Sequence, residues 1–371
     1  MSRLDKKCLR TVCKYFQNIE DFVSMIQVKK GLKNLFEKYT QNPIPLTQKT
    51  RAFFPNITVY SISTVRSNTF QDGKINQLLY NFTVDYERFL VERSRNNICR
   101  KVVFTQQNKA KFGVGVPDGV NVIEDACFLN NRMSQIVLPT SLTSLPDSCF
   151  DGCENLRKLK MSQRVTSIGN ACFKDCTQLT KIELPSCLVS LGKLSFYSCY
   201  QITTLKIPKH IQSIGSGCFI MCSQLKSITF PSSLTYLGNS ILFNCMNLES
   251  VILPNSLLTL GDFFFANCAS LKHLEIPMTV TSLGSNCFNG CSQLQNIFLP
   301  LNLNSIGMRC FSKCSSLRNI EVPKTVLKIS LYAFEECHRL SAITIPSRFK
   351  DTTDIFSFKL PTELNILVYY N

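Results

Sequence analysis

Cysteine is the residue type that offers this 371-residue chain the most chemistry. Nine of its 19 cysteines recur every 23 residues: Cys153, Cys176, Cys199, Cys222, Cys245, Cys268, Cys291, Cys314 and Cys337. Such cysteines could form disulfides, bind zinc, carry out redox chemistry, or fill small buried positions. A constant spacing places them in one column if the repeats stack, so their chemistry depends on the distance between neighbouring repeats.

Stacked repeats would keep these cysteines too far apart for disulfides or zinc. Side chains in register on adjacent strands are about 5 Å apart, whereas the Cβ atoms of a disulfide are about 3.8 Å apart. Zinc needs four ligands around one point, but a column of cysteines is linear. We therefore expect buried, reduced thiols and no bound metal. Pairs four residues apart, such as Cys149 and Cys153, could oxidise if a helical turn brings them together.

Residues suited to acid–base catalysis are scarce. The chain has three histidines, His210, His273 and His338, and no tryptophan. Histidine is the side chain that changes charge most readily near neutral pH. We therefore expect neither an enzymatic activity nor a cofactor.

The 23-residue unit that carries each cysteine has the pattern of a stacked coil. In one unit, Leu179, Ile182 and Leu184 are followed by Pro185, which predicts a short strand that ends where a backbone N–H is missing. Gly192 then permits a tight corner, and the following Phe-x-x-Cys spacing predicts one helical or 3₁₀ turn. Because one unit cannot bury its own apolar side, the units must stack with their strands in parallel.

The repeated phrase L-x-x-I-x-L-P-x-x-L-x-x-I-G-x-x-C/A-F-x-x-C resembles the leucine-rich repeats of the BspA-like type, which occur in bacterial surface proteins and in parasitic protists. The resemblance covers roughly residues 114–346. It implies a leucine-rich-repeat solenoid with a parallel β-strand face, short helical or 3₁₀ convex segments and a protein-binding role. It implies no catalytic residues.

Four regions follow from the position of the repeats. Residues 1–50 are interpreted as an N-terminal helical segment, 51–112 as degenerate early coils, 113–346 as about ten 23-residue repeats, and 347–371 as a C-terminal cap.

The N-terminal helical segment has two interpretations. It could cap the open end of the solenoid, because terminal repeats need shielding.

Alternatively, the N-terminal segment is similar to a divergent F-box, in which a hydrophobic helical hairpin docks on a ubiquitin-ligase adaptor. This similarity implies a Skp1-like adaptor as partner. The apolar residues that would contact the adaptor are Leu9, Val12, Tyr15, Phe16, Phe22 and Val28.

The net charge of +16 is spread unevenly along the chain. Residues 1–100 carry 17 Lys or Arg against 8 Asp or Glu, and residues 126–371 carry 21 against 14. No compact basic run resembles a nucleic-acid-binding arm, so we expect no nucleic acid as partner. The distribution of the charges over the strand face is therefore more informative than their sum.

Outward positions of the strand face alternate with the buried leucines and align into columns. The basic residues expected on this concave face are Arg157, Lys158, Lys160, Lys181, Lys206, Lys226, Lys272 and His273. These side chains could bind an acidic segment of a protein partner. The alternative is a solvated face, because lysines on exposed strands also discourage edge pairing and aggregation.

The sequence contains no apolar stretch of about 18 residues, the length needed for a membrane-spanning helix, and it does not begin with an apolar signal core. The absence of these features and the expected unpaired thiols favour the cytoplasm as the location of the protein. The alternative is export to the cell surface by an unconventional route. The expected function is a non-catalytic protein-binding scaffold. The alternatives are an F-box-like substrate receptor of a ubiquitin ligase and a surface-associated adhesion protein.

Overall fold

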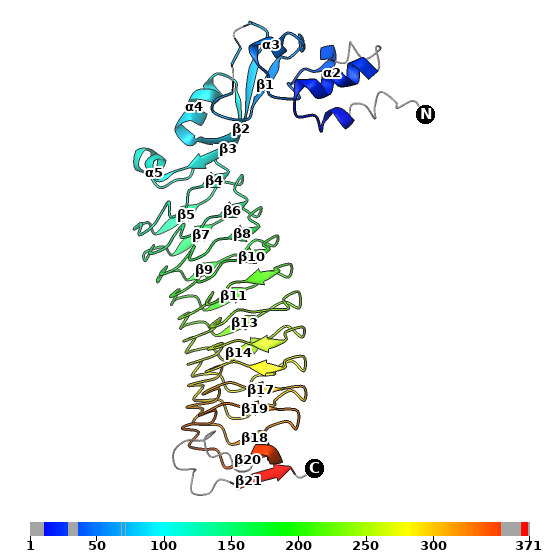
Figure 1. The fold of residues 1–371 in the computed structure, drawn as a ribbon. Coiled ribbons are helices and arrows are strands. Elements are labelled where there is room, and N and C mark those ends of the chain that lie inside the picture. Colours follow the sequence, from blue (N-terminus) through cyan, green and yellow to red (C-terminus); the bar gives the residue numbers. More distant parts are fainter. Residues whose placement is uncertain (1–10, 29–35, 68, 71, 350–364, 370–371) are drawn as a thin grey trace. The chain divides into compact units, whose positions relative to one another are not determined.

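The computed structural model of the protein describes residues 11–28, 36–67, 69–70, 72–349 and 365–369 (Figure 1). The chain forms two compact units, Met1–Asn108 and Lys109–Asn371. None of the helices in the described residues has the length and apolar character needed to span a lipid bilayer.

The first unit combines short helices with three parallel strands. Its elements are α2 (Ile19–Val28), α3 (Gln48–Arg51), β1 (Val59–Ile62), β2 (Gln77–Asp85), α4 (Tyr86–Ser94) and β3 (Ile98–Phe104), with α5 (Gln106–Phe112) next in the chain. β1 pairs with β2, and β2 with β3. Val59 faces Gln77 and Leu79 faces Ile98, so one turn of chain here is shorter than 23 residues. The division of the chain into four regions, with residues 51–112 as degenerate early coils, stays a prediction.

The second unit is a solenoid in which most coils contribute a short strand to a first parallel ladder, while the coils of Cys268 and Cys291 contribute isolated bridges such as that of Glu275 with Phe298. Its strands are β5 (Gln135–Val137), β7 (Lys158–Lys160), β9 (Lys181–Ile182), β11 (Thr204–Lys206), β13 (Ser227–Thr229), β14 (Ser250–Ile252), β18 (Asn319–Glu321), β20 (Ala342–Pro346) and β21 (Asn365–Tyr369). Thr204 faces Ser227, which in turn faces Ser250, so the register advances by one 23-residue repeat. The predicted parallel strand face is confirmed. We call its solvent-exposed side the strand face.

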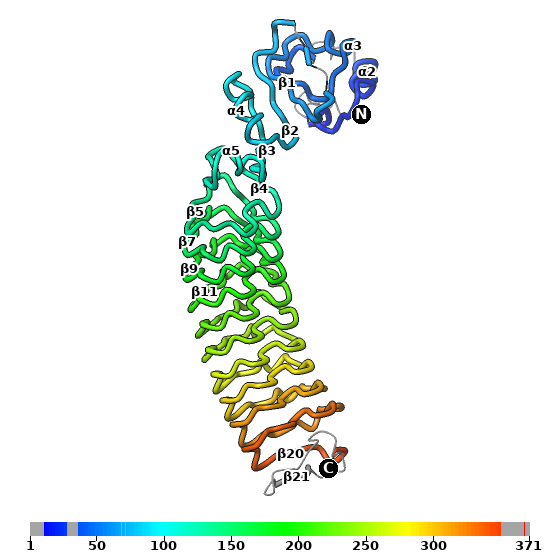
Figure 2. Tube along the Cα trace, turned by 90° about the vertical axis from the view of Figure 1, so that its left-hand side faces the viewer, coloured from blue at the N-terminus to red at the C-terminus, as the bar shows by residue number. Residues whose placement is uncertain are grey.

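A second parallel ladder runs along another side of the same coils, where the sequence predicted only an apolar pair before a corner. Its strands are β6 (Ser144–Leu145), β8 (Ser167–Ile168), β10 (Ser190–Leu191), β12 (Ser213–Ile214), β15 (Thr259–Leu260), β16 (Ser282–Leu283), β17 (Ser305–Ile306) and β19 (Lys328–Ile329). β4 (Val122–Ile123) comes before them in the chain and belongs to another sheet. β6, β8, β10 and β12 pair in that order. Figure 2 shows the coils stacked as successive layers. The stacking places these segments side by side, so their backbone N–H and C=O groups find partners in the neighbouring coil.

The third side of each coil is a tight turn rather than a regular helix. Cys176 N–H donates to Phe173 C=O at 3.2 Å, which is the i to i+3 bond of a single 3₁₀-type turn. Phe173 N–H donates to Ser195 C=O in the next coil at 2.8 Å. Asp175, in the same turn, has a φ of 55°. The expected short convex turn is therefore present and is hydrogen-bonded to its neighbouring coil.

Stacked phenylalanines fill the core behind these turns. The rings of Phe150 and Phe173 are nearly parallel, 5.4 Å apart between centroids. The same stacking continues to Phe196 and Phe219, stops at Leu242, and resumes at Phe265. These rings are fully or almost fully buried. One large apolar side chain per coil thus excludes water along the solenoid axis.

Close approach of neighbouring coils explains the recurring glycine at the corner. A Cβ atom on Gly192 would lie 2.4 Å from the backbone nitrogen of Asn170 in the preceding coil. No rotation of a side chain could relieve that overlap, because the atom it meets belongs to the backbone. Glycine is therefore required at this corner by the stacking distance.

Candidate functional site

Each cysteine of the 23-residue series donates its S–H to a backbone carbonyl of the preceding coil. Cys199 donates to Phe173 at 3.1 Å and Cys245 to Phe219 at 3.2 Å. The other cysteines with this bond are Cys153, Cys176, Cys222, Cys268, Cys291, Cys314 and Cys337. The thiols therefore join adjacent coils as hydrogen-bond donors.

Burial makes these thiols chemically unreactive. It raises the pKa of the Cys153 thiol to about 11 and that of Cys245 to about 12. A thiol that stays protonated at neutral pH is a poor nucleophile and a poor metal ligand. The 18 cysteines in the described residues are all free, and Cys149 interacts with Cys172 of the next coil while both stay reduced. Cys8 lies outside the described residues.

The described residues do not assemble a metal centre: nowhere among them do three His, Cys, Asp or Glu side chains converge as ligands. The predicted column of cysteines is buried and has a structural role in this molecule. The residues that could meet a partner lie on the exposed surface instead.

The basic residues predicted for the strand face are all exposed. Lys158 and Lys181 are neighbours in register on β7 and β9. Arg157 and Lys160 lie on the coil of Lys158. Lys206 ends β11, and Lys226 comes directly before β13. The structure thus gathers six of the predicted residues on four successive coils.

Lys272 and His273 are separated from that group and lie in a different charge environment. They are exposed on the coil of Cys268, two repeats beyond Lys226. Glu249 is exposed on the coil between them, and Glu275 on their own coil. This part of the strand face carries charges of both signs.

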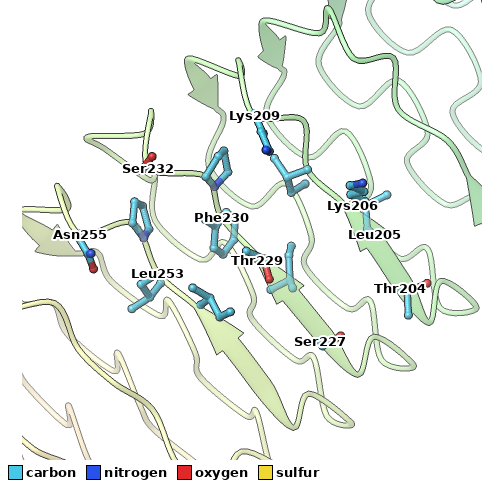
Figure 3. Close-up of a pocket in the computed structure, with 15 residues that line it drawn as sticks. Thr204, Leu205, Lys206, Lys209, Ser227, Thr229, Phe230, Ser232, Leu253 and Asn255 are labelled. Carbon is cyan, nitrogen blue, oxygen red and sulfur yellow. The ribbon is translucent and has the colours of Figure 1, made fainter.

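A long groove runs along the strand face and includes residues that were not predicted as binding positions from the sequence. One section, of about 820 Å³, is lined by Lys206, Lys209 and Phe230 among others, and Figure 3 shows it. A second section, of about 670 Å³, includes Met278 and Phe298. Both sections include Ile252, Leu253 and Asn255, so they are continuous. We call this continuous depression the ladder groove.

Two of these groove residues follow the repeat proline by one position, namely Lys209 after Pro208 and Met278 after Pro277. All binding positions predicted from the sequence lie before the repeat proline, so these two residues were missed. The available signal was their constant spacing from the proline, which places them in one column. Ile252 and Phe298 carry a clearer signal, because they are apolar at outward strand positions and are 62% and 87% exposed.

The residues predicted to contact an adaptor lie in different environments within the first unit. Val12 and Tyr15 are exposed, Phe16 is half-buried, and Phe22 is fully buried. The Phe22 ring packs edge-on against Phe16 at 4.8 Å and is also close to Phe36 and Phe54. Phe22 therefore belongs to the core of its own unit. Leu9 and the side chain of Val28 lie outside the described residues.

The fold of this chain is similar to that of a solved leucine-rich repeat protein. A leucine-rich repeat protein from Bacteroides ovatus ATCC 8483 has a TM-score of 0.64 and 23% sequence identity, covering 85% of this chain and 84% of that one. A leucine-rich cell surface protein from Faecalibacterium prausnitzii has a TM-score of 0.41 and 21% identity, covering 70% and 86%. The pneumococcal vaccine antigen PcpA has a TM-score of 0.45 and 20% identity, covering 85% and 80%.

No curated protein matches the chain. At the level of sequence families, residues 121–249 and 238–359 match the BspA type leucine rich repeat region. These two overlapping ranges span most of the solenoid unit and more than half of the chain. The chain therefore belongs to the BspA-type leucine-rich repeat family.

Proposed function

We propose that this protein is a non-catalytic scaffold whose strand face binds an acidic segment of a partner protein. The observation that carries the proposal is the group of six exposed basic side chains on four successive coils. Basic side chains on successive coils form an elongated positive surface, which suits an extended acidic ligand.

Most of this positive charge is not neutralised within the chain. Lys181 pairs with Glu183 at 3.2 Å, and both side chains are more than three-quarters exposed. Within the described residues, Lys158, Lys160 and Lys206 have no carboxylate within 4.0 Å. Carboxylates of a partner would relieve the repulsion among these lysines, and such charges favour fast and specific association.

Charge reversal tests this function. We expect Lys160→Glu combined with Lys206→Glu to abolish binding of a fluorescein-labelled peptide of alternating Glu and Gly, measured by fluorescence anisotropy at low salt. The matched control is Lys193→Glu with Lys328→Glu, because both lysines are exposed and lie outside the strand face. Binding of the wild-type protein should weaken as salt rises, since exposed charges are screened over about 8 Å at physiological ionic strength.

Three results would contradict the proposal: no binding of the acidic peptide, equal loss in the control variant, or binding that does not respond to salt. In any of these cases the lysines serve only to keep the strand face solvated. Circular dichroism of each variant establishes that the solenoid is intact, and this outcome is expected because all four lysines are exposed.

A second candidate function places adaptor binding in the first unit. It is favoured by two exposed apolar side chains, Val12 at 44% and Tyr15 at 80% exposure. The test is binding of a purified Skp1-like adaptor to the wild-type protein and to a Val12→Asp, Tyr15→Asp variant. Binding that the variant loses would support a ubiquitin-ligase receptor, and no binding by the wild-type protein would exclude it.

A reducing compartment, namely the cytoplasm, is the proposed location, with the cell surface as the alternative. The free cysteines of the described residues support the cytoplasm, because unpaired thiols persist in reducing compartments. Localisation by immunofluorescence with and without permeabilisation distinguishes the two, since labelling of intact cells would place the protein at the surface.

A further inference from the structure

The ladder groove has two exposed walls and a buried apolar floor. The wall nearer the strands contains one residue from each of five successive coils: Lys206, Thr229, Ile252, Glu275 and Phe298. The opposite wall contains the residue after each repeat proline: Lys209, Ser232, Asn255 and Met278. The floor is formed by Ile207, Phe230, Leu253 and Ile276, which are 2–7% exposed. Figure 3 shows Phe230 lying between Thr229 and Ser232.

The chemistry of the walls changes from one end of the groove to the other. At the first coil, Lys206 and Lys209 stand on opposite walls. At the next coil both walls are polar and uncharged, with Thr229 and Ser232. Further along, Ile252, Met278 and Phe298 are apolar although each is more than half exposed. Large apolar side chains left in water at the rim of a groove are typical of a binding surface.

The carboxylates of the strand face limit where an acidic ligand can lie. Glu275 is in the wall of the apolar section, and Glu321 is exposed two coils further along the same column. An acidic segment would be repelled there and attracted at Lys206 and Lys209. The charges therefore assign the acidic part of a ligand to the lysine end and leave the other end to apolar side chains.

The length of the groove fits a short extended peptide. Lys206 and Phe298 are separated by four coil spacings, each about 4.8 Å, which gives about 19 Å. An extended chain advances about 3.3 Å per residue, so about six residues would cover this distance. A segment of this length could place carboxylates and apolar side chains over the two ends at the same time.

We propose that the ladder groove binds one extended partner segment of about six residues with acidic residues at one end and aromatic or aliphatic residues at the other. Its carboxylates pair with Lys206 and Lys209, and its apolar side chains pack between Ile252, Met278 and Phe298. This proposal rests on the proposed function and adds to it the position, length and mixed character of the ligand.

Selection from a random library of phage-displayed dodecapeptides tests the proposal with the full chain. We expect the enriched peptides to contain an acidic end and an apolar end in a constant order. A synthetic peptide of the most enriched sequence then serves as the probe for affinity measurements. The variant Ile252→Thr, Phe298→Thr should bind it about tenfold or more weakly, as expected for the loss of buried apolar contacts. Threonine already occupies this column at Thr229, so the variant should fold.

The matched control is Leu258→Thr with Leu327→Thr, which removes two exposed apolar side chains outside both the groove and the strand face and should change the affinity less than about twofold. Lys206→Glu with Lys209→Glu should also weaken binding about tenfold, and this loss should disappear for a peptide whose acidic residues are replaced by Gln. That second comparison places the acidic end over the lysines.

The outcomes separate this inference from the proposed function. Enriched peptides that are acidic throughout, and whose affinity the threonine variant leaves unchanged, would overturn the inference while the acidic-segment function stands. Enrichment of apolar peptides without acidic residues would overturn both. Failure to enrich any peptide would also overturn the inference. Concentration-dependent self-association of the wild-type protein would overturn it too if the variant Ile252→Thr, Phe298→Thr abolishes that association, since the apolar wall would then contact a second copy.

Discussion

At the scale of single residues, the cysteine column shows how one side chain meets two demands of a stacked coil. The position is fully enclosed, and it faces a carbonyl of the preceding coil, such as that of Phe173 for Cys199. Cysteine fills a small volume and supplies a weak S–H donor to that carbonyl. Leucine would be too large for the space, and alanine would leave the carbonyl without this donor.

The raised thiol pKa values predict that alkaline pH destabilises the solenoid. The pKa of Cys245 is about 12 in the folded protein against the ordinary value of 9.0. The unfolded chain therefore releases this proton at lower pH than the folded protein, so the contribution to stability is complete below pH 9 and is lost as pH rises from 9 to about 12. The expected slope is about 1.4 kcal/mol per pH unit for one thiol.

Urea unfolding of the wild-type protein and of Cys245→Ala, followed from pH 8 upward, measures this effect. The variant should be less stable at pH 8, but its free energy of unfolding should fall less steeply above pH 9 than that of the wild type. Titration of lysines and tyrosines is common to both proteins and cancels in the difference. Parallel curves for the two proteins would show that Cys245 does not titrate as expected.

At the scale of elements, each coil turns its third corner with residues in the left-handed conformation. Gly152 and Gly290 have φ values of 69° and 75°, but Asp175 and Lys313 adopt similar values, 55° and 61°, without being glycine. The left-handed conformation costs an L-residue about 1–2 kcal/mol. The hydrogen bonds to the next coil stabilise it, for example from Lys313 N–H to Glu335 C=O at 2.8 Å.

Replacing Lys313 by glycine should therefore stabilise the protein. The expected gain is about 0.5–1 kcal/mol, because relief of the left-handed strain exceeds the entropy that glycine loses on folding. The ion pair of Lys313 with Glu336 is long, 4.0 Å, and half exposed, so its loss matters little. The urea midpoint measures the gain, with Lys313→Ala as control. A glycine variant no more stable than the alanine variant would contradict the prediction.

At the scale of the whole solenoid unit, stability comes from contacts between neighbouring coils. Leu179 is fully buried, and the next residue, Thr180, is exposed. Leu179→Ala should reduce the free energy of unfolding by about 2–5 kcal/mol, as for other large-to-small core substitutions. Because each coil contacts mainly its neighbours, the loss should be concentrated near the substitution.

Hydrogen exchange measures where that loss occurs. Amide protection in Leu179→Ala should fall in β9 and β11, while the amides of β18 and β20 keep most of theirs. Thr180→Ala is the control, and its stability should stay within about 0.5 kcal/mol of the wild type. A uniform loss of protection along the whole unit would mean that the solenoid unfolds as a single cooperative body.

The sequence by itself determined the period, the stacking of coils and the buried thiols. A constant spacing of 23 residues can repeat one environment only if each unit occupies an equivalent coil, so Cys245 and Leu179 are buried for the same reason as their counterparts. The alternation around Leu159 likewise identified Lys158 and Lys160 as exposed. These are local consequences of periodicity and side-chain polarity.

The tertiary structure decided what the coils place next to one another across their corners. The second ladder forms because segments such as Ser190–Leu191 and Ser213–Ile214 are brought into register, although two residues carry no strand pattern of their own. The ladder groove arises in the same way, since Lys206 and Lys209 belong to one coil while Ile252 and Phe298 come from later ones. The shape of a groove depends on the direction of each side chain at the proline turn, and the period does not specify that direction.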